Sequence, residues 1–433
     1  MLKRFYIETY GCQMNEYDSE ILAGILTGQD YAVSGDPEHA DIILLNTCSV
    51  REHAEQKIHS RLGELKELKK KNPNLKIGLV GCMAQNLKRD ILKNKSYVDM
   101  ILGPDSYRHI PEYLGSSEKH IIDTDLSKYE VYEGLFPSRK ESVNAWIPIM
   151  RGCDKFCSYC IVPYTRGRER SKSISSIVRE AERSAEQGFV EITLLGQNVN
   201  SYRYGKFRFH DLLKALANVK GIRRIRYTSP HPQDINEALL KVHADYKPLI
   251  ANHIHLPLQA GSDNVLQRMN RTYSQEHYLR IVDMIRKYVP DMGITTDMIV
   301  GFPGETDADF RETLNVMQKV KFDSAYMFKY SPRPHTKAAK LPDDVSEAEK
   351  SARLTDVINL QKEHTLYRYR GMIGKEAEIL VESESKRSPD EMKGRTSCNK
   401  IVIFPRENYK AKELIRRRIT DARGVSLFSR PKG

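Results

Sequence analysis

Three apolar segments in the N-terminal part of the chain each end at a cysteine, and this pattern constrains the fold most. The segments RFYIETYG, ADIILLNT and LKIGLVG have the composition of strands and end at Cys12, Cys48 and Cys82. Helix-like segments separate them, at 17–28 and 51–71. This alternation predicts a doubly wound parallel sheet, whose strand ends share one edge. We expect the three thiols to converge there, although three separately buried cysteines would give the same pattern.

The length of 433 residues suggests two or three domains at roughly 100–200 residues each. We expect an N-terminal α/β domain over 1–124 that includes two further short strands, DMILGP and KHIIDT. The polar, irregular segment 125–143 predicts a linker. A second α/β unit is expected over 144–371 and a small β-rich unit over 372–433.

Six strand–helix units between 144 and 371 predict a partial (β/α)6 barrel. Polar residues gather where these strands end, which is where barrel enzymes hold their active sites. The predicted strands are WIPIMRG (146–152), VEITLLGQ (190–197), RRIRYTSP (223–230), NHIHLPLQ (252–259), GITTDMIVGFPGE (293–305) and DSAYMFKYSP (323–332).

The last segment of the chain reads as alternating strands, EAEILVES, GRTSCNKIVIFP and LIRRRITDARGVSLFS, and predicts a small β-barrel. The formal net charge of the whole chain is +12, and residues 372–433 carry 15 Lys and Arg against 9 Asp and Glu, a net of +6. A basic module suits a polyanionic partner such as RNA, and a merely solvated basic tail is the alternative.

The N-terminal sequence MLKRFYIETYGC lacks the long apolar region of a secretory signal. The longest apolar runs, such as IILL at 42–45, are far shorter than the ~20 residues of a membrane-spanning helix. We therefore expect a cytoplasmic protein. Disulfides are improbable in that compartment, so the seven cysteines indicate metal ligands or catalytic thiols.

The segment GCDKFCSYC places Cys153, Cys157 and Cys160 in a single loop, with the spacing Cys-x3-Cys-x2-Cys. Three thiolates this close can hold three irons of a [4Fe–4S] cluster and leave the fourth iron open for a substrate or cofactor. Structural zinc is the competing metal, but zinc prefers four closed ligands. The histidines that could complete a zinc site are His231, His253 and His255.

This spacing on the first strand of a barrel resembles the radical S-adenosylmethionine (SAM) superfamily. The segments DKFCSYCIVPYTRGRER, LLGQNVNSY, HLPLQAGSDNVLQRMNRTY and DMIVGFPGET narrow the resemblance to the methylthiotransferase family, as does the N-terminal cysteine triad. The resemblance covers nearly the whole chain and is closest to members that act on N6-isopentenyladenosine at position 37 of tRNA. Members that act on N6-threonylcarbamoyladenosine are the alternative. One departure is YSPRPHTKAA, where the family usually reads YSPRPGTPA.

The resemblance implies two [4Fe–4S] clusters: an auxiliary one on Cys12, Cys48 and Cys82, and a radical SAM one on Cys153, Cys157 and Cys160. It implies that reduction cleaves SAM to a 5′-deoxyadenosyl radical, and that a methylthio group replaces hydrogen at C2 of the adenine ring, with a second SAM supplying the methyl group. The implied partners are tRNA, an external electron donor and a sulfur donor. We expect no membrane partner, and we expect a monomeric chain because nothing in the sequence demands a dimer. The C-terminal module resembles the RNA-binding TRAM domain.

The barrel mouth supplies candidates for SAM contacts, although polar residues at strand ends also cap helices or bind water. Tyr159 sits next to the last cysteine of the loop, and the others end strands or follow them. These candidates are Tyr159, Gly196, Gln197, Ser229, Gln259, Arg271 and Gly301. Two arginine runs are candidates for RNA contacts, with a solvated face as the alternative for the first run. They are Arg166, Arg168 and Arg170, and Arg416, Arg417 and Arg418. Cys398 has no partner at metal spacing and is read as a structural thiol.

A second class of function also accounts for cysteine triads and a basic tail, namely a non-enzymatic RNA-binding iron–sulfur sensor. Such a protein needs neither the polar strand ends of a barrel nor a cluster with an open iron. The sequence therefore favours the radical enzyme.

Overall fold

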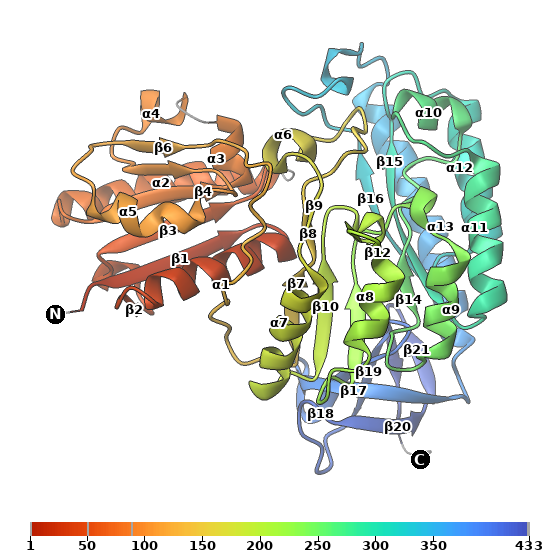
Figure 1. Ribbon diagram of the computed structural model, residues 1–433. Helices are drawn as coiled ribbons and strands as arrows, with labels where there is room; N and C mark the ends of the chain where they lie inside the picture. The colour runs from red at the N-terminus through yellow and green to blue at the C-terminus, as the bar shows by residue number, and fades with distance from the viewer. Residues whose placement is uncertain (1, 50–51, 88–89, 431–433) are drawn as a thin grey trace.

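The structure is a computed structural model that describes residues 2–49, 52–87 and 90–430. It contains a six-stranded N-terminal sheet, a half-barrel built from two three-stranded parallel sheets, and a six-stranded C-terminal sheet (Figure 1). The half-barrel lies between the other two, and all three follow one another along the chain. Among the described residues, no helix combines the length and the apolar character that crossing a bilayer requires.

The N-terminal sheet is parallel throughout, in the order β2-β1-β3-β4-β5-β6. Buried side chains of β3 alternate between its two faces: Ile42 and Leu44 belong to one apolar core and Ile43 and Leu45 to the other. Helices cover both faces, as the doubly wound prediction requires. The strands are β1 (Arg4–Tyr10), β2 (Ala32–Val33), β3 (Ile42–Thr47), β4 (Lys76–Gly81), β5 (Met100–Leu102) and β6 (Ile121–Asp123). The helices are α1 (Gln13–Thr27), α2 (Glu52–Lys71), α3 (Cys82–Leu87), α4 (Asp90–Asn94) and α5 (Ile110–Gly115).

The half-barrel has six parallel strands, and a single bridge between Ile225 and Ile250 links its two sheets. Its strands are β7 (Asn144–Pro148), β10 (Glu191–Leu195), β13 (Arg224–Tyr227), β14 (His253–His255), β15 (Gly293–Val300) and β16 (Ser324–Lys329). Its helices are α6 (Val162–Arg166), α7 (Ile174–Glu186), α8 (Phe209–Leu216), α9 (Glu237–Asp245), α10 (Asp263–Arg268), α11 (Gln275–Tyr288), α12 (Asp307–Val320) and α13 (Glu347–Arg370). Two further antiparallel pairs are formed: β8 (Met150–Arg151) pairs with β9 (Arg170–Ser171) across the segment that contains α6, and β11 (Arg203–Tyr204) and β12 (Phe207–Arg208) form a small hairpin. The partial barrel is confirmed, with one refinement: the predicted first strand divides at Ile149 into β7 and β8.

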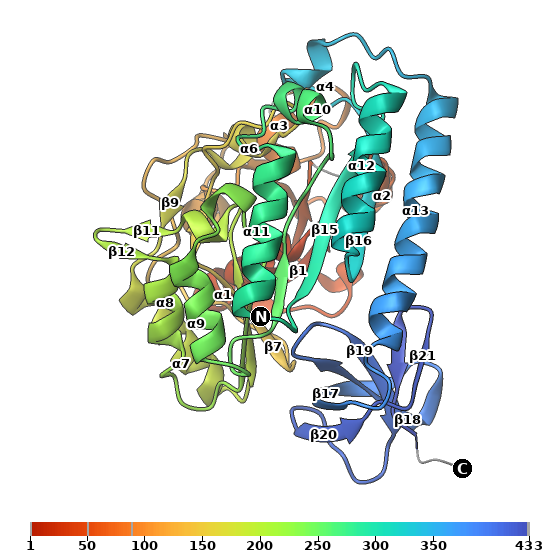
Figure 2. The same ribbon diagram turned by 90° about the vertical axis from the view of Figure 1, so that its right-hand side faces the viewer.

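The C-terminal sheet curls around an apolar core that includes Ile379, Val381, Val402 and Phe404 (Figure 2). Its strand order is β20-β17-β18-β19-β22-β21. The small β-rich unit predicted from the sequence is therefore present. The strands are β17 (Glu376–Ser385), β18 (Ser388–Thr396), β19 (Ile401–Pro405), β20 (Leu414–Arg418), β21 (Asp421–Arg423) and β22 (Ser426–Phe428).

Arg226 on β13 joins the C-terminal sheet to the half-barrel. Its Nε donates to the carboxylate of Glu191 at 2.8 Å, and its terminal nitrogens donate to the backbone carbonyls of Thr396 at 2.8 Å and Ser397 at 3.2 Å. Both side chains of the ion pair are 8% exposed. A charge-assisted contact that is buried in this way depends on both partners.

We predict that Arg226→Met lowers the free energy of unfolding by about 3 kcal/mol, because it leaves the Glu191 carboxylate buried without its cation. Urea unfolding of the full-length protein measures this change. Arg223→Met, at an exposed position three residues away on the chain, serves as the control and is expected to change stability by less than about 0.5 kcal/mol. Equal stabilities of the two variants would contradict the proposed role of Arg226.

Candidate functional site

Cys12, Cys48 and Cys82 follow three neighbouring strands of the N-terminal sheet. Tyr10 pairs with Thr47, and Thr47 pairs with Gly81, so β1, β3 and β4 end at the same level. Cys12 caps α1, Cys48 directly follows β3, and Cys82 opens α3. The triad therefore lies along one edge of the sheet, where the sequence placed it.

Asn15 on α1 forms hydrogen bonds that connect the strand ends at this edge. Its side-chain oxygen accepts a hydrogen bond from the backbone of Cys12 at 3.3 Å, and its amide nitrogen donates to Asn46 at 3.0 Å. A Cβ at position 11 would lie 2.3 Å from that side-chain oxygen, so only glycine fits at Gly11. Sequence reasoning did not single out Asn15, a polar residue on the buried face of a helix.

Arg166, at the end of α6 in the half-barrel, reaches across to this triad. Its Nε donates to the Cys82 sulfur at 3.2 Å, and one terminal nitrogen donates to Asp18 on α1 at 2.9 Å. Burial raises the pKa of Cys82, and the Arg166 guanidinium opposes that shift. Although burial disfavours its charge, the carboxylate of Asp18 and the thiols of Cys82 and Cys12 raise the pKa of Arg166. Arg166 therefore stays a cation beside the triad.

Arg166 and Arg170 correct the prediction of an arginine run that faces RNA. Both residues are buried, at 3% and 7% exposure, and their guanidinium groups pair with Asp18 and Asp105 inside the molecule. Only Arg168 of this run is exposed, paired with Asp154. The alternating pattern arises because every second side chain points inward, which the residue types alone did not reveal.

The C-terminal arginines divide in a similar way. Arg416 and Arg418 are exposed on β20, whereas Arg417 forms an ion pair with Glu407 and packs against Tyr409. Cys398 lies in the turn between β18 and β19, with its sulfur 3.2 Å from the Thr396 hydroxyl.

Cys153, Cys157 and Cys160 lie in the loop between β8 and α6, where burial and the nearby Cys157 raise the pKa of Cys153 and of Cys160. The loop begins at Gly152, whose φ of +78° disfavours other residues; a Cβ there would lie 2.0 Å from the Arg168 carbonyl oxygen. The Cys153 amide donates to the carbonyl of Gly167 at 3.1 Å. The sequence between the triad and Arg168 thus folds back to close the loop.

Arg271 stands beside this second triad as Arg166 stands beside the first. Its terminal nitrogen donates to the Cys157 sulfur at 3.2 Å, and its Nε donates to the Tyr273 hydroxyl at 3.1 Å. Arg271 is one of the residues predicted from the sequence to contact SAM. The structure places it at the cysteine loop, next to Tyr159, whose ring meets Phe302 edge-on at 6.4 Å.

The donor set suits iron–sulfur clusters better than a single ion. Among the described residues, no three His, Cys, Asp or Glu side chains gather closely enough to hold one metal ion. In a [4Fe–4S] cluster each thiolate binds a different iron, so its three sulfurs lie farther apart than ligands of one ion do. His253 and His255, considered for zinc, both contact the Thr295 hydroxyl at 3.0 Å instead.

Gln197 lies two residues after the end of β10, and its side-chain oxygen is buried with no hydrogen-bond partner among the described residues. The neighbouring Asn198 also has a buried oxygen without a partner there. Buried polar atoms of this kind are costly unless a ligand or water satisfies them. Gly196 lets the chain pass Met150, because a Cβ would approach the Met150 side chain to 2.7 Å. These atoms fit a polar ligand at the barrel mouth.

The remaining SAM candidates differ in what the structure shows. Ser229 and Gln259 have positive φ angles of 57° and 67°, a strained backbone that often marks ligand sites. Gly301 also has a positive φ, but a Cβ there would lie 2.3 Å from the Lys350 side chain. The packing of Lys350 alone therefore explains why position 301 is a glycine.

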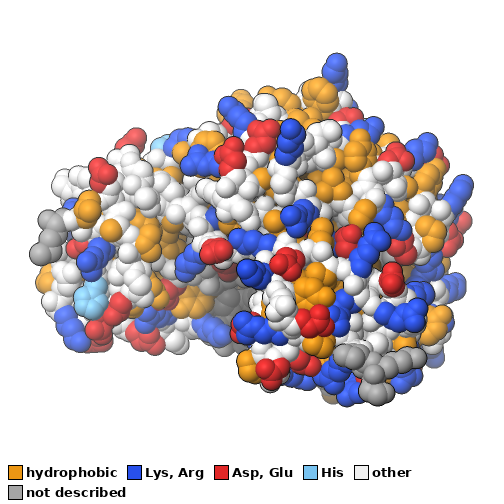
Figure 3. All heavy atoms as spheres, turned by 90° about the horizontal axis from the view of Figure 1, so that it is seen from below, with side chains coloured by type: hydrophobic (Ala, Val, Ile, Leu, Met, Phe, Trp, Pro, Cys, Tyr) orange, Lys and Arg blue, Asp and Glu red, His pale blue; other side chains and the backbone are white. Residues whose placement is uncertain are grey.

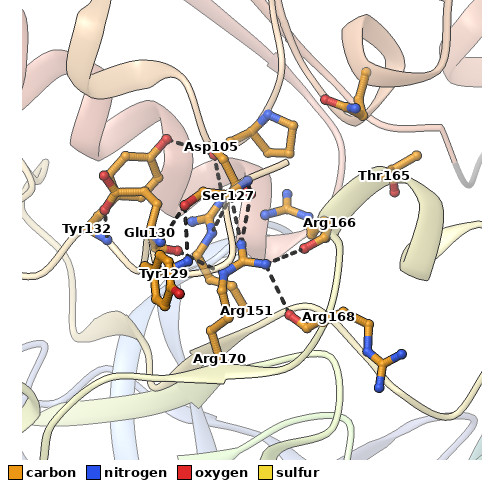
Figure 4. A network of polar contacts seen from close by, with 12 residues as sticks. Asp105, Ser127, Tyr129, Glu130, Tyr132, Arg151, Thr165, Arg166, Arg168 and Arg170 are labelled. Carbon is orange, nitrogen blue, oxygen red and sulfur yellow. Dashed lines mark hydrogen bonds and ion pairs between the residues drawn. The ribbon is translucent and has the colours of Figure 1, made fainter. Parts of the chain in front are cut away.

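A buried charge network joins the N-terminal sheet to the half-barrel, and sequence reasoning missed it. Arg151 on β8 donates to Asp18 at 3.0 Å and lies 3.6 Å from Asp105, which also pairs with Arg170 at 2.9 Å. Figure 4 shows Arg151 and Arg170 side by side around Asp105. The segment 125–143 also contacts this network, because the ring of Tyr132 lies 4.8 Å from the Arg151 guanidinium. One sequence feature could have indicated this network: Asp18 is a charged residue on the buried face of α1.

The inner face of β14, β15 and β16 carries polar and aromatic side chains. His255 lies 3.1 Å from Asp297, and its ring meets that of Tyr326 edge-on. Tyr326 and Phe328 are 62% and 54% exposed, which is unusual for large side chains in the middle of a barrel strand.

Seen from below, the molecule has a hollow between the N-terminal sheet and the rest (Figure 3).

Comparison with protein families agrees with this division of the chain. Residues 4–103 match the uncharacterized protein family UPF0004, and residues 147–317 match the Radical SAM superfamily. A tRNA-2-methylthio-N6-dimethylallyladenosine synthase from Azobacteroides pseudotrichonymphae is 47% identical over 100% of this chain and 97% of its own length. The synthases of that name from Porphyromonas gingivalis (strain W83) and Thermoanaerobacter sp. (strain X514) are 46% and 44% identical over 98% of this chain and 94% and 91% of their own lengths.

The chain belongs to this synthase family.

Two solved structures with low sequence identity have a similar fold. The radical SAM methyltransferase TsrM from Kitasatospora setae, determined with cobalamin and a [4Fe–4S] cluster bound, aligns with a TM-score of 0.59 and 13% identity. The alignment covers 78% of this chain and 77% of TsrM. The cobalamin-dependent radical enzyme OxsB aligns with a TM-score of 0.55 and 12% identity over 83% of this chain and 56% of its own. At these identities the likeness shows the fold alone.

We predict that the Cys153 and Cys160 thiols of the metal-free protein react slowly with iodoacetamide near neutral pH. Burial raises the pKa of Cys153 to about 11 and that of Cys160 to about 12, so the reactive thiolate forms only as the pH approaches those values. Peptide mass spectrometry should show labelling rates that keep rising up to pH 10. N-acetylcysteine, an unburied thiol, is the control, and a plateau by pH 9 at either cysteine would contradict this prediction.

Proposed function

We propose that this chain is a radical SAM methylthiotransferase that adds a methylthio group to C2 of N6-isopentenyladenosine (N6-dimethylallyladenosine) at position 37 of tRNA. The observation that carries the proposal is the presence of two cysteine triads, the first of which is contacted by Arg166 of the half-barrel, in a chain that matches the synthase family over its full length. A non-enzymatic sensor would need neither the second triad at a barrel mouth nor the buried, unsatisfied oxygen of Gln197.

In this proposal Cys12, Cys48 and Cys82 hold an auxiliary [4Fe–4S] cluster, and Cys153, Cys157 and Cys160 hold the radical SAM cluster. When bound, the clusters and SAM supply the radical chemistry that replaces a C–H bond too weakly acidic for acid–base catalysis. The protein contributes position and charge. Arg166 and Arg271 each donate a hydrogen bond to one cysteine sulfur.

The residues at the barrel mouth then hold SAM. The free oxygen of Gln197 suits the SAM amino group, and the adjacent Gly196 lets the chain pass close to Met150 at this point. The other candidates for SAM contacts are Tyr159, Ser229, Gln259 and Arg271. Gly301 is also a candidate, although its packing against Lys350 already accounts for a glycine at that position.

The tRNA contacts follow from exposure and charge. Arg416 and Arg418 point outward from the C-terminal sheet, and Arg168 is exposed near the cysteine loop. These three suit contacts with the phosphate backbone. In contrast, Arg166, Arg170 and Arg417 already form ion pairs with carboxylates of the protein. The exposed aromatic side chains of β16 give the flat target base a surface on which to stack.

We keep the division into an N-terminal methylthiotransferase domain (1–124), a linker (125–143), a radical SAM domain (144–371) and a TRAM-like domain (372–433) as part of the proposal. The enzyme needs an external electron donor and a sulfur donor. We place it in the cytoplasm with its tRNA substrate, as a monomer. The threonylcarbamoyladenosine alternative is less well supported, because the relatives quoted above are all named for the dimethylallyl substrate.

Anaerobic reconstitution with iron and sulfide, followed by incubation with SAM, dithionite and isopentenylated tRNA, tests the proposal. We expect 5′-deoxyadenosine and the methylthio nucleoside to form together, as measured by mass spectrometry. Replacing Cys12 with Ala should abolish the methylthio product, and replacing Cys157 with Ala should abolish both. Cys398→Ala is the matched control and should change neither. Two intact clusters without 5′-deoxyadenosine would contradict the enzyme assignment, and a product only on threonylcarbamoylated tRNA would replace the substrate.

A further inference from the structure

Arg166 of the half-barrel donates a hydrogen bond to a cysteine of the N-terminal triad. Its guanidinium group has three nitrogens with different surroundings. Nε contacts the Cys82 sulfur at 3.2 Å and one terminal nitrogen contacts Asp18 at 2.9 Å. The other terminal nitrogen is buried and has no hydrogen-bond partner among the described residues. The side chain is only 4% exposed, so bulk water does not replace that partner.

An unsatisfied donor on a buried cation destabilises the folded protein unless a partner is supplied. Rotation of Arg166 to another partner is restricted, because Asp18 is itself held by Arg151 at 3.0 Å. Arg151 is fixed in turn by the carbonyl of Pro104 at 2.8 Å. The free N–H is therefore held in place beside the triad, close enough to Cys12 and Cys82 for both thiols to raise the pKa of Arg166.

We propose that Arg166 is a positioning residue for the auxiliary cluster: it fixes the Cys82 thiolate through Nε and donates its free N–H to a sulfur atom of the cluster. This inference rests on the assignment of Cys12, Cys48 and Cys82 as ligands in the proposed function. Arg166 lies in the half-barrel, six residues after Cys160. The electronic state of one cluster thus depends on docking of the domain that carries the other.

The charge and hydrogen bonds around a cluster set its reduction potential. Reduction adds one negative charge, so a guanidinium that donates to the cluster favours the reduced form. Removing Arg166 should lower the midpoint potential of the auxiliary cluster. A purely structural role for Arg166 would change stability or iron content and leave the potential of a loaded cluster unchanged.

The test uses full-length protein in which Cys153, Cys157 and Cys160 are replaced with Ala, so that only the auxiliary cluster remains. Redox titration with dithionite, followed by electron paramagnetic resonance, gives the midpoint potential, and iron analysis gives the loading. For Arg166→Met we expect at least a tenfold change in the reduced-to-oxidised ratio at a fixed potential, which is about 59 mV for a one-electron couple.

Arg166→Lys is the second variant, because it keeps a cation for Asp18 and guards against misfolding. It should shift the potential in the same direction by a smaller amount. Arg168→Met, two residues away and exposed, is the control and should shift nothing. Full iron loading with unchanged potentials in both Arg166 variants would overturn this inference alone. A parent variant that binds no cluster would overturn the ligand assignment, and the inference with it.

Discussion

The Asp18 carboxylate, fully buried on α1, is the contact on which the arrangement of the two triads depends. It accepts from Arg151 at 3.0 Å and from Arg166 at 2.9 Å, and both arginines come from the half-barrel. Removing one partner of such a network leaves a buried charge uncompensated, which typically costs 3–5 kcal/mol. The N-terminal sheet and the half-barrel are thereby held in one relative position, and Arg166 is aimed at Cys82.

Buried charges are weak evidence for stability, because apolar residues of similar volume often pack as well. Their value here is specificity of position. An apolar interface would let the two domains slide, whereas Arg151 must reach Asp18 and Asp105 at the same time. Two clusters that act on a single base need that fixed geometry, since small displacements of reacting groups cost much of the rate.

The sequence predicted most of the fold, because strand and helix periodicity are local properties. It also placed the cysteines correctly, at strand ends and in one loop. It did not predict the network around Asp18, since contacts between α1 and α6 join residues 148 positions apart. It misread Arg166 and Arg170 for the same reason: an arginine that faces a buried carboxylate looks identical, in sequence, to one that faces a phosphate. The exposure of the side chain in the structure distinguishes the two kinds of arginine: Arg168 is exposed, whereas Arg166 and Arg170 are buried.

The central claim is that both triads belong to one site, and the spin coupling between the two reduced clusters tests it most directly. Cys160 and Arg166 are six residues apart, at most about 22 Å along an extended chain, and Arg166 contacts Cys82. Electron paramagnetic resonance of the doubly reduced protein should therefore show broadening that is missing from the summed spectra of the two proteins that each lack one triad. A wild-type spectrum equal to that sum would contradict the account.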